Sequence, residues 1–197
     1  MRSLRESSPG WSLVELMAFM AVMVTLAAFI APFTRNTVNA LNLTGDARSI
    51  QSAVSLAKMR AAASFTQARL VVNFGNSTFH VERFARNTNT WVIEGIVKQL
   101  SPTVSFGFSG IPAPPPNTQP AIAQAPPCLD NANNPIAGTA CIVFNSRGMP
   151  VDATNAPTAL DALYVGDGAT VFGVTVSTGG MIQLWRSNLG NGNWVLN

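Results

Sequence analysis

A long apolar segment near the amino terminus constrains this chain more than any other feature. Residues 13–31 contain no charged side chain except Glu15, and Pro32 follows them. At about 1.5 Å rise per residue, a helix over this range is roughly 28 Å long, close to the ~30 Å hydrocarbon core of a bilayer. Apolar residues cover every face of that helix, unlike the single stripe of a core helix. The segment is therefore a membrane helix or an export signal.

The residues around this segment distinguish it from an ordinary signal peptide. Arg2 and Arg5 precede it, which predicts a cytoplasmic amino terminus and an exported carboxyl-terminal domain. A cleaved secretory signal has an apolar stretch of about 7–15 residues, and this stretch is longer. A carboxylate in a membrane helix costs on the order of 2–3 kcal/mol, so Glu15 indicates a function. A plain signal and a generic anchor are the alternatives.

The string GWSLVEL, residues 10–16, resembles the class III leader of type IV pilins and pseudopilins. The resemblance implies that prepilin peptidase cleaves between Gly10 and Trp11 and methylates the new amino terminus on Trp11. The chain departs from the family at Trp11, where phenylalanine is usual. Glu15 has the position of the family's glutamate, and Pro32 has that of its helix-kinking proline.

The four-residue spacing between Trp11 and Glu15 has a physical explanation. After cleavage the amine of Trp11 lies near the membrane, about one helical turn before Glu15. A buried carboxylate without a partner is costly, so pairing with the amine of a neighbouring subunit favours one axial register. The resemblance therefore implies that Glu15 is an assembly residue and that the apolar helix stays on the mature protein.

Beyond Pro32 the sequence stays helical but becomes amphipathic. Apolar residues recur at spacings of four and three along one face, namely Leu43, Ala47, Ile50, Val54, Ala57 and Ala61. This stripe predicts a helix to about Ser64 that packs on a sheet as core and does not bind a cofactor. Gly45-Asp46 is a predicted weak point at which, together with Pro32, the helix bends or melts locally.

After the helix the hydrophobic pattern changes to a period of two. Strands are predicted over residues 68–74, 77–84, 90–97, 103–108, 140–145, 160–165, 171–177 and 181–186, with a tight turn at Gly75-Asn76. Residues 110–135, rich in Pro, Ala, Gln and Asn, predict a long surface loop. One helix followed by many antiparallel strands gives the α+β class.

The helix and the first strand also resemble the FimT/GspH branch of minor pilins and pseudopilins. Residues 48–53, 57–62 and 68–72 carry this resemblance, and residues 144–148 and 174–185 look like the carboxyl-terminal strands of that branch. The implied fold is pilin-like, with a long helix, transmembrane in its first half and amphipathic in its second, packed on antiparallel β-sheets. The predicted parts are a leader at 1–10, a transmembrane and assembly helix at 11–32, an amphipathic helix at 33–65 and a β-rich domain at 66–197 that includes the Pro-rich loop 110–135.

Two cysteines, Cys128 and Cys141, flank the Asn-rich end of the predicted loop. The leader implies an exported, oxidising location, where disulfides persist. The resemblance thus implies a Cys128–Cys141 disulfide, worth roughly 3 kcal/mol in the chain-entropy account. Two free thiols are the alternative, and the absence of a Cys-x-x-Cys pattern disfavours a catalytic redox pair.

The sequence contains no recognisable catalytic motif. It lacks the H-E-x-x-H, P-loop and G-x-S-x-G patterns, and its 2 Cys and 1 His exclude Cys-rich and His-rich metal sites. His80 is interpreted as a partly buried structural residue of a strand. Residues 130–134 resemble a calcium loop but lack its acidic spacing, so a turn is favoured. Asp161 and Asp167 are interpreted as solvated or capping residues, and we expect no enzyme, metal or cofactor.

The charge distribution gives little support to nucleic-acid binding. Charged residues make up 11% of the chain, and a net charge of +3 is scattered without a basic stripe. The motif of DNA-binding FimT-like pilins resembles Gly-Arg-x-Arg, whereas residues 180–183 read GMIQ. Arg147 and Arg186 are two dispersed candidates for phosphate contact. We do not expect a nucleic-acid partner.

The function that the resemblance implies is that of a minor pilin or pseudopilin, a structural subunit of a type IV pilus or a type II secretion pseudopilus. The implied partners are prepilin peptidase, other pilin or pseudopilin subunits, the inner-membrane assembly platform and the membrane itself through residues 11–32. The protein is expected in the inner membrane as a single-pass chain with a periplasmic domain, or in an assembled filament. The alternatives are a major or adhesive subunit, a DNA-binding uptake pilin and an anchored domain unrelated to filaments.

Overall fold

The computed structural model describes residues 12–158 and 161–197, without the side chains of residues 29–35. The chain forms two units, Met1–Asn39 and Ala40–Asn197. Helix α1 (Leu13–Ala63) is assigned without a break from one unit into the other. Because the side chain of Pro32 lies outside the described residues, the kink expected there stays a prediction.

Within the described residues, ten strands follow α1 and form two antiparallel sheets. The first sheet has the order β3-β2-β1-β5-β6, and the second has the order β10-β9-β8-β7-β4. The strands are β1 (Ala68–Asn73), β2 (Thr78–Ala85), β3 (Thr90–Gln99), β4 (Ser105–Phe106), β5 (Thr139–Phe144), β6 (Pro150–Val151), β7 (Asp161–Gly166), β8 (Thr170–Val176), β9 (Ile182–Asn188) and β10 (Trp194–Leu196). An α+β class with antiparallel sheets is confirmed.

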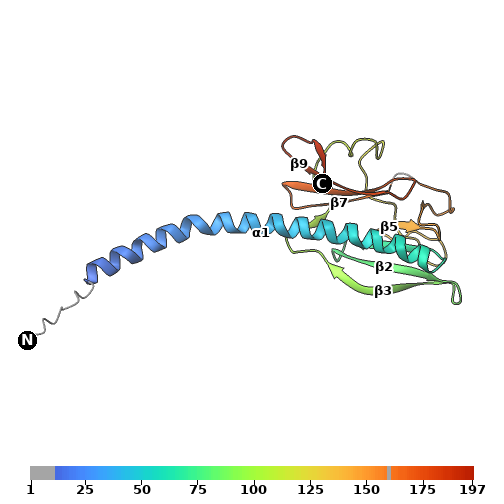
Figure 1. The fold of residues 1–197 in the computed structure, drawn as a ribbon, viewed down its shortest axis with the longest axis horizontal. Coiled ribbons are helices and arrows are strands. Elements are labelled where there is room, and N and C mark those ends of the chain that lie inside the picture. The colour runs from blue at the N-terminus through green and yellow to red at the C-terminus, as the bar shows by residue number, and fades with distance from the viewer. Residues whose placement is uncertain (1–11, 159–160) are drawn as a thin grey trace, which may run out of the picture. The chain divides into compact units, whose positions relative to one another are not determined.

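The carboxyl-terminal part of α1 lies between the two sheets (Figure 1). Every residue of the predicted apolar stripe, from Leu43 to Ala61, is at most 1% exposed. The same core takes Leu70 from β1, Ile142 from β5 and Val174 from β8. The prediction that this helix face packs on a sheet as core is confirmed, and the helix in fact packs against two sheets.

The local melting predicted at Gly45-Asp46 is wrong, since α1 is continuous through both residues, whereas a bend there stays a prediction. Asp46 instead fixes the helix to the segment that follows β3, because its Oδ2 accepts a hydrogen bond of 2.8 Å from the Ser101 N–H. A helix interior tolerates a glycine at a cost of about 1 kcal/mol, which burial of the neighbouring stripe offsets.

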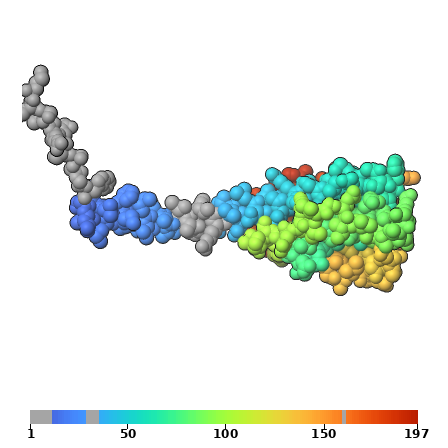
Figure 2. All heavy atoms as spheres, turned by 90° about the horizontal axis from the view of Figure 1, so that it is seen from below, coloured from blue at the N-terminus to red at the C-terminus, as the bar shows by residue number. Residues whose placement is uncertain are grey.

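Strand β3 is one edge of the first sheet, and its atoms, yellow-green in Figure 2, lie on the surface of the domain. Ile93, Ile96 and Val97 are each more than half exposed. The strand is nevertheless tied to α1, because Lys98 Nζ donates a hydrogen bond of 3.0 Å to Ser49 Oγ.

Most of the predicted strands are present with shifts of one or two residues at their ends. β4 is shorter than the predicted 103–108, and β6 and β10 were not predicted because two or three residues are too few to show a period. The turn expected at Gly75-Asn76 is present, but the left-handed residue is Ser77, with φ 52°.

The predicted loop 110–135 covers the outer face of the second sheet with its first half. The side chain of Gln124 pairs with the backbone of Tyr164 in both directions, each hydrogen bond being 2.9 Å long. The Tyr164 hydroxyl donates to Gln119 Oε1 at 2.8 Å. Beneath the loop Tyr164 joins a second apolar cluster with Ile111, Ala162 and Val171. This part of the loop is therefore packed structure.

Gly173 of β8 leaves room for the buried Tyr164 ring, because a Cβ at position 173 lies 2.8 Å from Tyr164 Cε1. We expect Gly173→Ala to lower the free energy of unfolding by about 1–3 kcal/mol through overpacking, measured by urea unfolding. Gly190→Ala is the matched control, since a Cβ there meets nothing within 4 Å. Equal stability of the two variants would contradict this packing.

Candidate functional site

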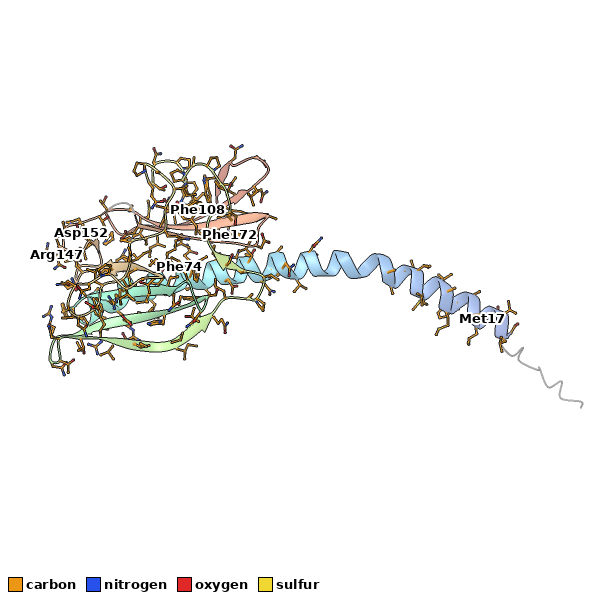
Figure 3. The ribbon with its side chains drawn as sticks, turned by 180° about the vertical axis from the view of Figure 1, so that it is seen from behind. Met17, Phe74, Phe108, Arg147, Asp152 and Phe172 are labelled. Carbon is orange, nitrogen blue, oxygen red and sulfur yellow. A yellow bond between two sulfur atoms is a disulfide. The ribbon has the colours of Figure 1, made fainter. Side chains whose placement is uncertain are left out.

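The amino-terminal unit presents an apolar helix surface. Its large apolar side chains between Leu13 and Leu26 are all more than half exposed, from 52% at Met23 to 74% at Leu13. Figure 3 shows Met17 projecting from this part of α1. Glu15 is the acidic residue of the first turn. A contiguous apolar surface of this kind marks an interaction with a membrane or with other proteins.

In the part of the chain that the structure describes, no helix combines the length and the apolar character needed to cross a membrane. Gly10 and Trp11, the residues of the expected cleavage and methylation, lie outside the described residues. Cleavage, methylation and the assembly role of Glu15 stay predictions.

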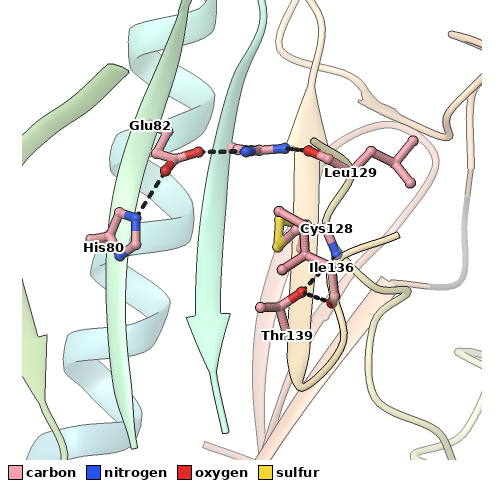
Figure 4. The surroundings of a disulfide bond; sticks show 8 residues. His80, Glu82, Cys128, Leu129, Ile136 and Thr139 are labelled. Carbon is pink, nitrogen blue, oxygen red and sulfur yellow. Dashed lines mark hydrogen bonds and ion pairs between the residues drawn. A yellow bond between two sulfur atoms is a disulfide. The ribbon is translucent and has the colours of Figure 1, made fainter. Parts of the chain in front are cut away.

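The outer face of the first sheet carries a network of polar side chains (Figure 4). Arg69 on β1 lies opposite Glu82 on β2, and its Nε and Nη2 both lie 2.7 Å from Glu82 Oε2. The other carboxylate oxygen is 3.0 Å from His80 Nε2. Arg69 Nη1 also donates to the Leu129 carbonyl at 2.7 Å. The interpretation of His80 as a partly buried structural residue is confirmed.

Burial makes the Arg69–Glu82 pair a structural element. The two side chains are 5% and 13% exposed. Burial acts to raise the pKa of Glu82, but the hydrogen bond with His80 and the charge of Arg69 outweigh it, so that this pKa is lowered. Burial lowers the pKa of Arg69 against the opposing effect of Glu82. Removing one member of such a pair costs about 3–5 kcal/mol because a buried charge remains uncompensated.

The structure contains the expected Cys128–Cys141 disulfide beside this network. Both cysteines pack with Val71 in an apolar cluster on the outer face of the sheet. The Cys128 N–H donates to Thr139 Oγ1 at 3.1 Å, and the Thr139 hydroxyl donates to the Ile136 carbonyl at 2.6 Å. The disulfide thus holds the second half of the predicted loop against β5.

A pocket of about 540 Å³ lies between this loop and the sheet. Arg69, Phe84 and Trp91 line its sheet side. The Arg69 Cζ atom lies 4.0 Å from the centre of the Trp91 ring, and the Phe84 and Trp91 rings meet edge to face at 5.3 Å. On the loop side, Asn131 Oδ1 accepts a hydrogen bond of 3.3 Å from the backbone N–H of Trp91.

Two hairpin loops of the same construction border this pocket, over residues 130–134 and 152–156. Asp130 and Asp152 each donate their N–H to the carbonyl four residues further on, at 2.9 Å. Each carboxylate accepts backbone N–H groups two and four residues further on. The turn favoured over residues 130–134 is confirmed. The Asp130 carboxylate caps this turn, and the Asp152 carboxylate caps the other one.

The interpretation of Asp161 as a solvated or capping residue is wrong. Asp161 is the first residue of β7 and is 5% exposed. It therefore lies in a buried strand and not in a solvated turn. Asp167 does cap a turn, since its Oδ1 accepts the N–H groups of Ala169 and Thr170 at 2.9 Å.

Arg147 and Arg186 are both exposed, but the structure does not bring them together. Arg147 lies in the turn before Gly148, whose carbonyl is 2.6 Å from the position of a Cβ on Gly180. Figure 3 shows Arg147 at the same end of the domain as Asp152. Arg186 lies in β9, six residues after Gly180. In the described part of the chain no hydrogen bond, ion pair or ring contact joins the two arginines.

No family model matches the sequence, and no curated protein matches it either. Two solved structures of the minor pseudopilin EpsH from the type II secretion system of Vibrio cholerae are similar to this one. Their TM-scores are 0.46 and 0.45, each at 11% sequence identity, and they cover 73% and 75% of this chain and 94% of EpsH.

Burial, reinforced by the charge of Asp152, raises the pKa of Asp161 to about 6. The folded protein therefore holds a proton at Asp161 that the unfolded chain releases near pH 4, so stability falls as the pH rises from about 4 to 6. Near pH 7 the ionised carboxylate costs about 2–3 kcal/mol. We expect Asp161→Asn to raise the melting temperature near pH 7 and to change it little near pH 4.

Differential scanning calorimetry at the two pH values measures this difference. Asp167→Asn is the matched control, because an asparagine can replace this half-buried cap and keep its hydrogen bonds. A melting temperature of Asp161→Asn below that of the unaltered protein at both pH values would contradict this explanation.

Proposed function

We propose that this protein is a minor pilin or pseudopilin, a structural subunit rather than an enzyme. Prepilin peptidase cleaves it between Gly10 and Trp11, and the subunit then enters, or primes the assembly of, a type IV pilus or a type II secretion pseudopilus. The observation that carries this proposal is the exposed apolar first part of α1, which contains a single acidic residue, Glu15, in its first turn.

The apolar surface of the first unit needs a partner at each stage of this pathway. Leaving side chains such as Leu13 and Leu16 in water forgoes roughly 1.5–3 kcal/mol each relative to burial. Before assembly, the segment 13–31 lies in the inner membrane, with the domain from Ala40 onward in the periplasm. In the filament, the helices of neighbouring subunits replace the lipid.

Glu15 fits this pathway because its charge needs a partner within the apolar environment. The amine that cleavage creates on Trp11 is the complementary group. Pairing between subunits satisfies both charges and fixes the axial position of each helix. A helix that served only as an anchor would gain nothing from a carboxylate at this position.

The Cys128–Cys141 disulfide supports the exported location of the domain. The proposed partners are therefore those of an inner-membrane subunit with a periplasmic domain: prepilin peptidase, other pilin or pseudopilin subunits and the assembly platform. In each case the amino-terminal helix supplies the contact.

Replacing Glu15 tests the assembly role. We expect Glu15→Leu to remain in the membrane fraction but to fall about tenfold or more in the sheared filament fraction of cells carrying the assembly system, because the amine of Trp11 loses its partner. Quantitative immunoblotting of the two fractions measures this ratio. Met17→Leu is the control, since Met17 is an exposed apolar residue of the same helix. Normal assembly of Glu15→Leu would exclude this role.

A further inference from the structure

We propose that the pocket beside the Cys128–Cys141 disulfide binds a neutral oligosaccharide, through the aromatic side chains of its sheet side and the asparagine amides of its loops. All of the pocket residues belong to the unit Ala40–Asn197. The proposal goes beyond the assembly function and does not depend on it, because it uses no residue of the amino-terminal unit.

Three asparagines from three separate turns converge on this pocket. Asn89, Asn133 and Asn155 all line it, and all have left-handed backbones, with φ of 55°, 63° and 64°. Asparagine is several-fold enriched among non-glycine residues at positive φ, which explains its presence in a turn. The preference of asparagine for positive φ explains each turn by itself. It does not explain why three turns far apart in the sequence place their amides around one pocket.

Two hairpin loops that do not line the pocket provide the comparison, although Asn145 and Ser146 of the first line an adjacent hollow. Residues 145–149 and 177–181 form the same five-residue loop, with the first N–H donating to the fifth carbonyl at 2.9 Å in each. The left-handed residue of these loops is Gly148, with φ 72°, or Gly180, with φ 75°. Glycine adopts positive φ without steric cost. Among the described residues, asparagine therefore occupies this position in the two loops of this build that line the pocket, and glycine occupies it in the two that do not line it.

The amides are available to a ligand. Among the described residues, the side chains of Asn89 and Asn133 make no hydrogen bond within the protein, whereas Asn155 accepts one from Gln67 Nε2. A primary amide presents a carbonyl acceptor and two N–H donors. Neighbouring hydroxyl groups on a sugar ring, each of which both donates and accepts, are complementary to that arrangement.

The charges of the pocket disfavour an anionic ligand. The guanidinium of Arg69 is neutralised by Glu82 at 2.7 Å and does not offer a free positive charge. Asp130 and Asp152 border the pocket as carboxylates, and hydrogen bonds from their own loops lower the pKa of each. A phosphate or an acidic peptide would meet these two negative charges, whereas a neutral sugar hydroxyl can donate to them.

The apolar surface and the volume suit a sugar ring. Phe84 and the part of the Trp91 ring that Arg69 does not cover supply aromatic surface, and Val143 and Leu129 supply aliphatic surface, on the same pocket. The C–H face of a pyranose ring packs on such surface while its hydroxyls point to the rim. A volume of about 540 Å³ lies within the range of about 300–1,000 Å³ that is typical of small-ligand sites, and it admits a short oligosaccharide.

The test uses the full chain in micelles of a detergent without a sugar headgroup, such as lauryldimethylamine oxide. Chitotriose and maltotriose are titrated while the tryptophan indole N–H signals are followed by NMR, with Trp91 assigned from a Trp91→Phe sample. We expect a saturable shift of the Trp91 signal with at least one trisaccharide, at a dissociation constant between about 10 μM and 5 mM. The signals of Trp185 and Trp194 should not move.

Glycine variants separate the amides from the turns that carry them. The triple change Asn89→Gly, Asn133→Gly and Asn155→Gly keeps each left-handed turn and removes each amide, and we expect it to weaken binding at least about tenfold. Asn117→Gly is the matched control, because Asn117 has φ 59° and does not line the pocket.

The outcomes decide the proposal. Asn133→Gly alone is the second variant if the triple variant does not fold, and it should weaken binding about threefold. No saturable Trp91 shift with either trisaccharide, or equal binding by the amide variants and by Asn117→Gly, overturns the proposal. Both results are independent of whether the chain assembles into a filament.

Discussion

The packing of the carboxyl-terminal part of α1 between two sheets is the contact on which the rest of the domain depends. Its apolar stripe is almost completely buried, and residues of both sheets complete the same core. Polar contacts such as Asp46 to Ser101 then fix the helix along the first sheet. The inner faces of both sheets are thereby used, and only their outer faces are left for loops and ligands.

The two halves of the long loop pack differently on these outer faces. Over the second sheet, Gln119 and Gln124 hydrogen-bond to Tyr164, and an apolar cluster fills the space beneath the loop. Over the first sheet, the disulfide and the Arg69–Glu82 pair hold the loop beside the sheet and leave a pocket. The loop thus packs closely on the outer face of the second sheet around Tyr164 and leaves a pocket on the outer face of the first.

The elements that a local sequence pattern determines were predicted correctly. The four-and-three spacing from Leu43 to Ala61 predicted the buried helix face, and the period of two predicted the longer strands. The Arg69–Glu82 pair was missed because it forms across strands, and Asp161 was misread because burial is decided by tertiary packing. The pocket could not be predicted either, since Asn89, Asn133 and Asn155 come together only when three distant turns do.

In the proposed pathway the apolar helix stays on a processed subunit. The intact mass of the protein recovered from membranes, beside that of a Gly10→Ala variant, distinguishes this pathway from the alternatives. We expect a chain that begins at Trp11 with a methylated amine, and loss of this processing in the variant. Retention of residues 1–10 in the unaltered protein, or cleavage after about residue 31, which marks an ordinary signal, would contradict it.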